Sequence, residues 1–162
     1  MKKGWEIDDI TGLVVDAAFK LHTGLGPGLL ESVYEMVLAR DLERRGLIVE
    51  KQKPVSFEYD DLQFEDAFRV DLLIERCVVL ELKSVEILAP VHSKQLLTYL
   101  RLLNLPVGLL INFGAATMKE GLHRIVNNYR PSPTASPRLR VNQRSAMTRN
   151  SPGDVEGAEK NK

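Results

Sequence analysis

The residues best suited to chemistry lie in two neighbouring apolar segments. Glu81 and Lys83 stand two residues apart within residues 78–83, so they point to the same face of a predicted strand. Asp71 stands ten residues before Glu81 in a second apolar segment. A three-residue connection over residues 75–77 places Asp71 directly opposite Glu81 in a hairpin. The sequence therefore predicts that two carboxylates and one amine converge.

Two carboxylates in such a pair require a compensating charge. At about 4 Å they repel by roughly 4 kcal/mol at an effective dielectric constant near 20. A divalent cation compensates, since Mg²⁺ accepts oxygen ligands from one or two carboxylates together with water and substrate phosphate. The bound ion lowers the pKa of a water molecule, and a nearby ammonium positions that water or stabilises developing charge. The three side chains are thus suited to hydrolysis of a phosphodiester.

These three residues alone leave a plainer alternative open. Glu81 and Lys83 could form the solvated face of an amphipathic strand, with Asp71 a separate surface acid, because such short motifs recur by chance.

Two predicted helices add further polar side chains. Gln95 and Tyr99 are four residues apart and share one helix face. Glu31 and Glu35 are likewise one turn apart in an earlier helix, and either could supply a third carboxylate. His92 begins the helix of Gln95, where it is either a phosphate contact or an ordinary surface histidine.

Along the chain these candidates and the intervening Leu82 stand in the order Asp71, Glu81, Leu82, Lys83, Gln95 and Tyr99. This order resembles the PD-(D/E)XK nuclease superfamily, in particular its RecB-like and lambda-exonuclease-like branch. The preceding helix, with Gly28, Glu31 and Tyr34, resembles the GxxExxY family of the same superfamily. The resemblance extends over residues 8–128.

The resemblance implies a metal site. Asp71 and Glu81 would bind the metal, with the backbone carbonyl of Leu82 as a further ligand. Glu31 would be the acid that the leading helix contributes. The proline that usually precedes the first acid is replaced by Val70, which leaves the acid itself in place.

The resemblance also implies an activity. Asp71, Glu81 and Lys83 would be the catalytic residues of a nuclease that uses Mg²⁺ or Mn²⁺ and hydrolyses nucleic acid, with DNA expected. Gln95 and Tyr99 would help to hold the substrate backbone, and His92 is the third candidate for substrate binding. The alternative is a catalytically silent nuclease-like fold that serves as a nucleic-acid-binding or protein-interaction module.

Hydrophobic patterning predicts the elements that position these residues. Helices are expected over residues 8–22 and 29–45, joined by a glycine-proline elbow, and from Pro90 to near Asn104. Strands are expected over residues 47–50, 55–59, 68–74, 77–83 and 107–113. Residues 122–128 fit either an edge strand or a short helix. This order predicts an α/β fold with a mixed sheet flanked by helices, and the resemblance implies a restriction-endonuclease-like version of it.

Composition sets the domain organisation. The chain has 162 residues, 44% of them hydrophobic and 27% charged, which fits one globular domain. We expect the nuclease-like domain over residues 1–130 and a disordered tail over residues 131–162, rich in proline, serine and arginine. The arginines of the tail either attract nucleic acid or belong to a solvated linker.

Charge and cysteine content narrow the partners and the compartment. Residues 1–130 contain 16 basic and 19 acidic side chains, so bulk electrostatic attraction to nucleic acid is excluded unless some of the acids bind cations. Cys77 is the single cysteine, which excludes an internal disulfide and suits a reducing compartment. Apolar runs are too short to span a bilayer, and the N-terminus lacks a signal-peptide pattern. We therefore expect a cytoplasmic protein without a membrane partner.

Overall fold

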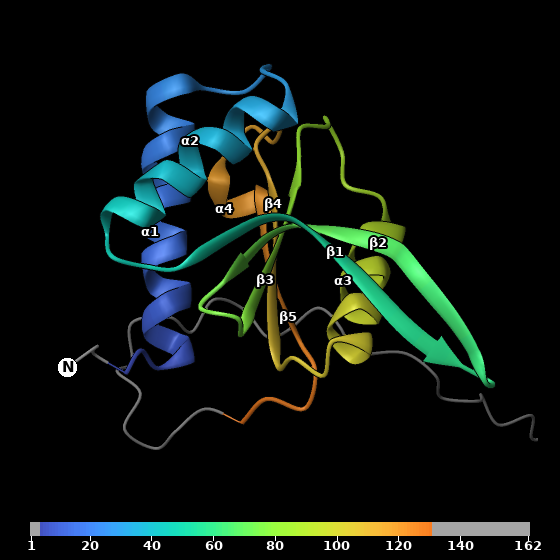
Figure 1. Cartoon of the computed structure of the whole chain (residues 1–162). Coiled ribbons are helices and arrows are strands. Elements are labelled where there is room, and N and C mark those ends of the chain that lie inside the picture. Colours follow the sequence, from blue (N-terminus) through green and yellow to red (C-terminus); the bar gives the residue numbers. More distant parts are fainter. Residues whose placement is uncertain (1–3, 131–162) are drawn as a thin grey trace, which may run out of the picture.

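A single five-stranded sheet forms the centre of the computed structural model, which describes residues 4–130 (Figure 1). Its strands are β1 (Val49–Tyr59), β2 (Leu62–Ile74), β3 (Val78–Lys83), β4 (Val107–Asn112) and β5 (Leu122–Val126). They lie side by side in this order. The pair β3–β4 is parallel and the other pairs are antiparallel. The mixed sheet predicted from the sequence is confirmed.

Helices cover both faces of this sheet (Figure 1). They are α1 (Ile7–Leu25), α2 (Glu31–Arg44), α3 (Pro90–Leu102) and the one-turn α4 (Met118–Gly121). Helix α3 connects the parallel strands β3 and β4, and Pro90 occupies its first turn, where a missing N–H costs nothing. The fold is therefore α/β and of the restriction-endonuclease-like class that the sequence predicted.

Alternating side chains of the strands build two hydrophobic cores. On one face, Leu80 packs among residues of α1 and α2, and the ring of Tyr34 stacks on Phe113 with centroids 4.4 Å apart. On the other face, Val79 packs against Leu96 of α3. Since residues of β3 alternate between two buried faces, a polar residue in this strand is enclosed whichever way it points.

Asn112 fixes the chain directly after β3. Its side chain is buried and accepts hydrogen bonds from the N–H groups of Val85 (3.0 Å) and Gly114 (3.1 Å). The Asn112 Nδ2 atom also donates to the Val85 carbonyl (2.8 Å). A side chain at position 114 would lie 2.4 Å from that carbonyl oxygen, so only glycine fits there. Because Asn112 is paired with Lys83 across β3 and β4, this clamp sets the end of β3.

One expectation about the strands was wrong. Residues 47–50 and 55–59 were expected to form separate strands, but both lie in the single strand β1, and β2 begins at Leu62 rather than at Phe68. Pro54 interrupts the apolar pattern without ending the strand, because β1 is an edge strand and tolerates a missing N–H. Asp60 and Asp61 form the turn between β1 and β2, with positive φ at both residues, as a tight hairpin requires.

Residues 122–128, which fitted either an edge strand or a short helix, contain an edge strand, and a one-turn helix that was not predicted precedes them. Residues 118–121 form α4, and Leu122–Val126 forms the edge strand β5, antiparallel to β4. The proposed tail, residues 131–162, lies outside the described residues. None of the helices within residues 4–130 has the length and apolar character needed to span a membrane.

Candidate active site

Strands β2 and β3 bring Asp71 and Glu81 together. The strands pair with Leu72 opposite Leu80 and Ile74 opposite Val78, which leaves a three-residue connection. Continued by one position, this register places Asp71 opposite Glu81, as the sequence predicted. Asp71 Oδ2 accepts a hydrogen bond from the backbone N–H of Leu82 (2.7 Å), so its carboxylate is held at the end of the β2–β3 ladder.

Glu81 is the most enclosed acid of the site. It is only 4% exposed, and Lys83 Nζ donates to its Oε1 atom over 2.7 Å. The second oxygen, Oε2, is buried and finds no hydrogen-bond partner within residues 4–130. Burial, followed by the charge of Asp71, raises the pKa of Glu81. Burial opposes the charged form of Lys83, but the bond to Glu81 and the neighbouring carboxylates outweigh it and raise the pKa of Lys83.

The donor set fits a hard divalent cation. A buried carboxylate oxygen without a partner is costly, and an oxygen-binding cation beside Asp71 and Glu81 would satisfy it. No group of three or more His, Cys, Asp or Glu side chains in residues 4–130 is close enough to hold a metal ion by itself. This arrangement suits Mg²⁺, which is typically held by one or two carboxylates and completes its shell with water and substrate phosphate.

Two acids near the start of helix α2, Glu31 and Glu35, lie near different partners. The charge of Glu31 contributes to the raised pKa of both Glu81 and Lys83, which places Glu31 near that pair. Glu35 lies near Asp71. Burial raises the pKa of Glu35, the hydrogen bond from Gln52 opposes this rise, and the charge of Asp71 adds to it. Both acids predicted for this helix therefore border the site.

Gln52 is a residue of the site that sequence reasoning missed. Its Nε2 atom donates to Glu35 Oε2 (2.6 Å) and lies 3.4 Å from Asp71 Oδ1. Although it lies within β1, its φ is +48°, a left-handed conformation that costs a non-glycine residue about 1–3 kcal/mol. Glutamine has no particular preference for this conformation, so no signal in the sequence could have revealed its role.

The twist at Gln52 changes which face of the hairpin is buried. Val49 packs against the core below α1 and α2, whereas Val55, an even number of residues later, packs against the core below α3. From Val49 to Val55 the pairing of β1 with β2 keeps one register but skips Gln52 and Asp71. The site acid Asp71 thus lies at the point where the hairpin rolls from one core to the other.

Two variants of Gln52 separate its backbone strain from its hydrogen bonds. We expect Gln52→Ala to lower the free energy of unfolding by about 1 kcal/mol, because alanine keeps the left-handed strain and loses the bonds to the acids. Gln52→Gly is expected to unfold at a higher temperature than Gln52→Ala, because glycine adopts positive φ freely. Thermal unfolding of both variants checks this, and identical midpoints would refute a strained backbone at this position.

The substrate-binding candidates lie on α3. Gln95 Nε2 donates to the hydroxyl of Tyr99, which confirms that they share a face. The ring of Tyr99 stacks on the ring of Phe68 in β2, with centroids 4.0 Å apart. Phe68 stands three residues before Asp71 in the sequence. His92 is half-buried, and its Nδ1 atom has no partner in the described part of the chain.

Within residues 4–130, none of these three side chains hydrogen-bonds to Asp71, Glu81 or Lys83. The stacking of Tyr99 on Phe68 links α3 to the part of β2 that leads into Asp71.

Comparison with known families accounts for this arrangement. The sequence profile of the PD-(D/E)XK nuclease superfamily matches residues 8–125. The chain belongs to this superfamily. No curated protein and no solved structure matches it. The matched PD-(D/E)XK region includes all the candidate residues from Glu31 to Tyr99 and nearly the whole sheet. Membership indicates a nuclease, since PD-(D/E)XK proteins generally cleave nucleic acid with divalent metal ions.

Proposed function

We propose that this chain is a cytoplasmic nuclease that depends on Mg²⁺ or Mn²⁺ and has DNA as its substrate. Within the superfamily we assign it to the GxxExxY family, in the RecB-like and lambda-exonuclease-like branch. The observation that carries the proposal is the buried Oε2 atom of Glu81, which has no protein partner in residues 4–130, in a carboxyl group whose pKa is raised by burial and by the charge of Asp71. The single cysteine, which would stay reduced, favours the cytoplasm.

In this proposal the carboxylates of Asp71 and Glu81 hold the cation. The carbonyl of Leu82 is a further ligand. The carboxylate of Glu31 does not form a three-acid group with them within residues 4–130, so it joins the shell by a change of its side-chain rotamer when the cation binds. When bound, the cation neutralises negative charge on a phosphoryl oxygen and lowers the pKa of a water molecule. The hydrogen bond from Leu82 N–H keeps the Asp71 carboxylate oriented, so one of its oxygens remains available.

Lys83 supports the reacting groups. Its ammonium is partly buried, and the hydrogen bond to Glu81 and the neighbouring carboxylates favour its charged form and raise its pKa. Once a bound cation neutralises part of the negative charge of Glu81, Lys83 can orient the attacking water or stabilise the negative charge that develops on the phosphate. Gln95, Tyr99 and His92 are proposed to hold the substrate backbone beside these groups.

A cleavage assay tests the activity. Circular and linear DNA, single- and double-stranded, is incubated with Mn²⁺, Mg²⁺ or EDTA and with wild-type protein or Glu81→Gln. We expect cleavage that requires metal and disappears in the variant, and the preference for circles or linear ends separates endonuclease from exonuclease action. Binding without cleavage under every condition would instead support the silent nuclease-like module.

Metal binding should also stabilise the fold. A site present only in the native state adds about 2.7 kcal/mol at a hundredfold excess of free cation over its dissociation constant. We expect the midpoint of thermal unfolding to rise by about 5–10 °C in the wild type on addition of Mn²⁺, and not in Asp71→Asn. Asp16→Asn, on the exposed side of α1, is the control and should respond like the wild type. An equal response in all three proteins would refute the assigned site.

A further inference from the structure

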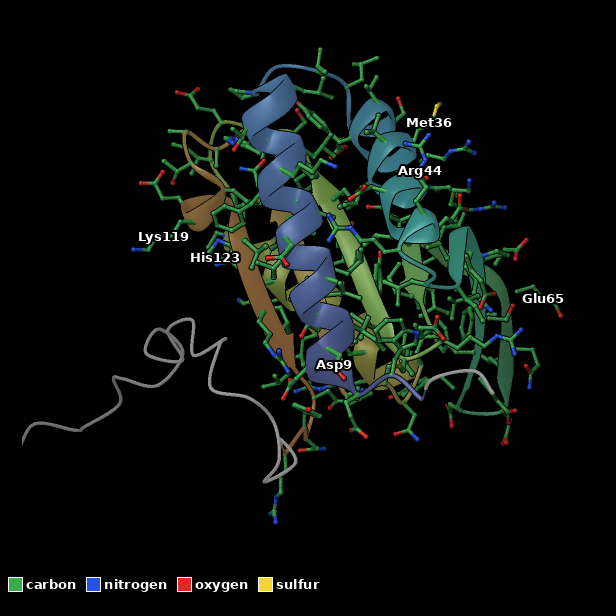
Figure 2. The ribbon with its side chains drawn as sticks, turned by 90° about the vertical axis from the view of Figure 1, so that its left-hand side faces the viewer. Asp9, Met36, Arg44, Glu65, Lys119 and His123 are labelled. Atoms are coloured by element: carbon green, nitrogen blue, oxygen red, sulfur yellow. The ribbon has the colours of Figure 1, made fainter. Side chains whose placement is uncertain are left out.

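The connection between α1 and α2, residues 26–30, is called the elbow here, and it leads directly into Glu31. Figure 2 shows the two helices side by side, with the elbow joining them at one end. Gly26 and Gly28 have φ of +73° and +104°, which glycine adopts without strain. Leu30, the N-cap residue of α2, provides no side-chain cap. The position of the first turn of α2 therefore depends on how the elbow itself is held.

The hydroxyl of Tyr34 bridges the elbow. It donates to the carbonyl of Gly26 (2.6 Å) and accepts from the N–H of Leu29 (3.2 Å). The ring of Tyr34 is fully buried and stacks on Phe113, so the hydroxyl has little freedom to move. Phe113 in turn donates its N–H to the carbonyl of Lys83 (2.8 Å). The elbow is thus connected through one aromatic pair to the end of β3.

Ser84 holds the elbow a second time. Its hydroxyl donates to the carbonyl of Leu29 over 2.7 Å. Ser84 directly follows Lys83, the last residue of β3. Tyr34 and Ser84 together bond both polar backbone groups of Leu29. The backbone of Leu29 is therefore fixed relative to β3.

Stability of the fold does not by itself require these bonds. Leu29 is 40% exposed and Leu30 74%, so the elbow lies at the surface. At the surface, water also satisfies backbone groups. Helix α2 is anchored separately by Leu38 and Leu42, which are buried in the core. What the bonds of the elbow add is a fixed starting point for α2.

The residue at this starting point is Glu31. It stands two positions after Leu29 and lies near Glu81 and Lys83, whose pKa values its charge helps to raise. In the proposed cation shell, Glu31 reaches the ion by a change of its side-chain rotamer. Such a change succeeds only if the backbone of Glu31 already lies at the correct distance, because a carboxylate oxygen must come within about 2.1 Å of Mg²⁺. A fixed Leu29 meets this requirement.

We propose that the hydroxyls of Tyr34 and Ser84 position Glu31 for the cation by fixing the elbow against the end of β3. Both are positioning residues, since neither hydroxyl bonds to the acids of the site within residues 4–130. This inference rests on the proposed metal site and adds to it two residues outside the group of acids.

The affinity for Mn²⁺ in two backgrounds tests this positioning role. Electron paramagnetic resonance of free Mn²⁺ measures the dissociation constant of the full-length wild type, of Ser84→Ala and of Tyr34→Phe, which keeps the stacked ring. We expect each variant to bind Mn²⁺ roughly tenfold more weakly, as is typical for residues that orient a metal ligand. In proteins that also carry Glu31→Gln, the same two changes should alter the affinity by less than about twofold, because both act through Glu31.

Ser32→Ala is the matched control. Ser32 lies exposed in the first turn of α2, and its hydroxyl forms no hydrogen bond in the described part of the chain. Its removal should leave the affinity unchanged, and circular dichroism verifies that every variant is folded.

The outcomes separate this inference from the proposed function. Equal losses of affinity with and without Glu31→Gln would overturn the positioning role alone, and so would wild-type affinity in folded Ser84→Ala or folded Tyr34→Phe. A wild type that binds no Mn²⁺ would overturn the proposed metal site and this assignment with it.

Discussion

Replacement of Lys83 by alanine is expected to lower the rate of metal-dependent cleavage by about two to four orders of magnitude. The ammonium group of Lys83 forms an ion pair with the buried carboxylate, with its Nζ atom 2.7 Å from Glu81 Oε1. Its removal takes away the group proposed to orient water or to stabilise the developing negative charge. Single-turnover rates at saturating Mn²⁺ measure this loss without a contribution from product release.

The control separates chemistry from substrate attraction. Lys94 lies on the exposed surface of α3, and Lys94→Ala removes the same charge without touching the acids. We expect its cleavage rate to stay within about threefold of the wild type, since an exposed charge contributes little. Equal rates for Lys83→Ala and the wild type would contradict a catalytic role for Lys83.

The second large effect concerns stability. Asn112→Ala is expected to lower the free energy of unfolding by about 3 kcal/mol, because it empties a buried side-chain site and leaves the N–H and carbonyl groups of the half-buried Val85 without their side-chain partner. Urea denaturation measures the change. Since Asn112 pairs with Lys83, this variant should also lose cleavage activity at temperatures where it remains folded.

Asn127 provides the comparison. Its side chain donates to the carbonyls of Leu100 and Leu105 at 3.3 and 3.2 Å, at the opposite end of β4, and it is only half-buried. We expect Asn127→Ala to lose about 1 kcal/mol of stability and no activity. A loss of stability in Asn112→Ala no larger than in Asn127→Ala would show that the clamp is not critical for the fold.

The local geometry of the site was predictable from the sequence. A strand repeats every two residues and a short connection fixes the register of its hairpin, so the pairing of Asp71 with Glu81 followed from residue spacing. The shared face of Glu81 and Lys83, confirmed by their hydrogen bond, followed in the same way. The parallel pairing of β3 and β4 followed from the intervening helix, because parallel neighbours need a crossover.

The parts that were not predictable depend on tertiary contacts. Gln52 adopts its left-handed conformation because β1 must change faces opposite Asp71, and no local preference encodes that change. Residues 47–50 and 55–59 were predicted as separate strands, whereas one strand runs through Pro54 because the sheet edge removes the cost of its missing N–H. Helical spacing placed Glu31 and Glu35 on one face of their helix. Their neighbours depend on how α2 packs on the sheet, which puts Glu31 near Glu81 and Glu35 near Asp71.

The central claim is that Asp71 and Glu81 hold a divalent cation, and anomalous diffraction from crystals soaked in Mn²⁺ tests it most directly. We expect an anomalous peak between the two carboxylates, bonded to the Oε2 atom of Glu81 that has no protein partner in residues 4–130. The peak should be absent in crystals of Glu81→Gln. Well-ordered wild-type crystals with millimolar Mn²⁺ and no peak at these carboxylates, or with the ion bound elsewhere, would contradict the assignment.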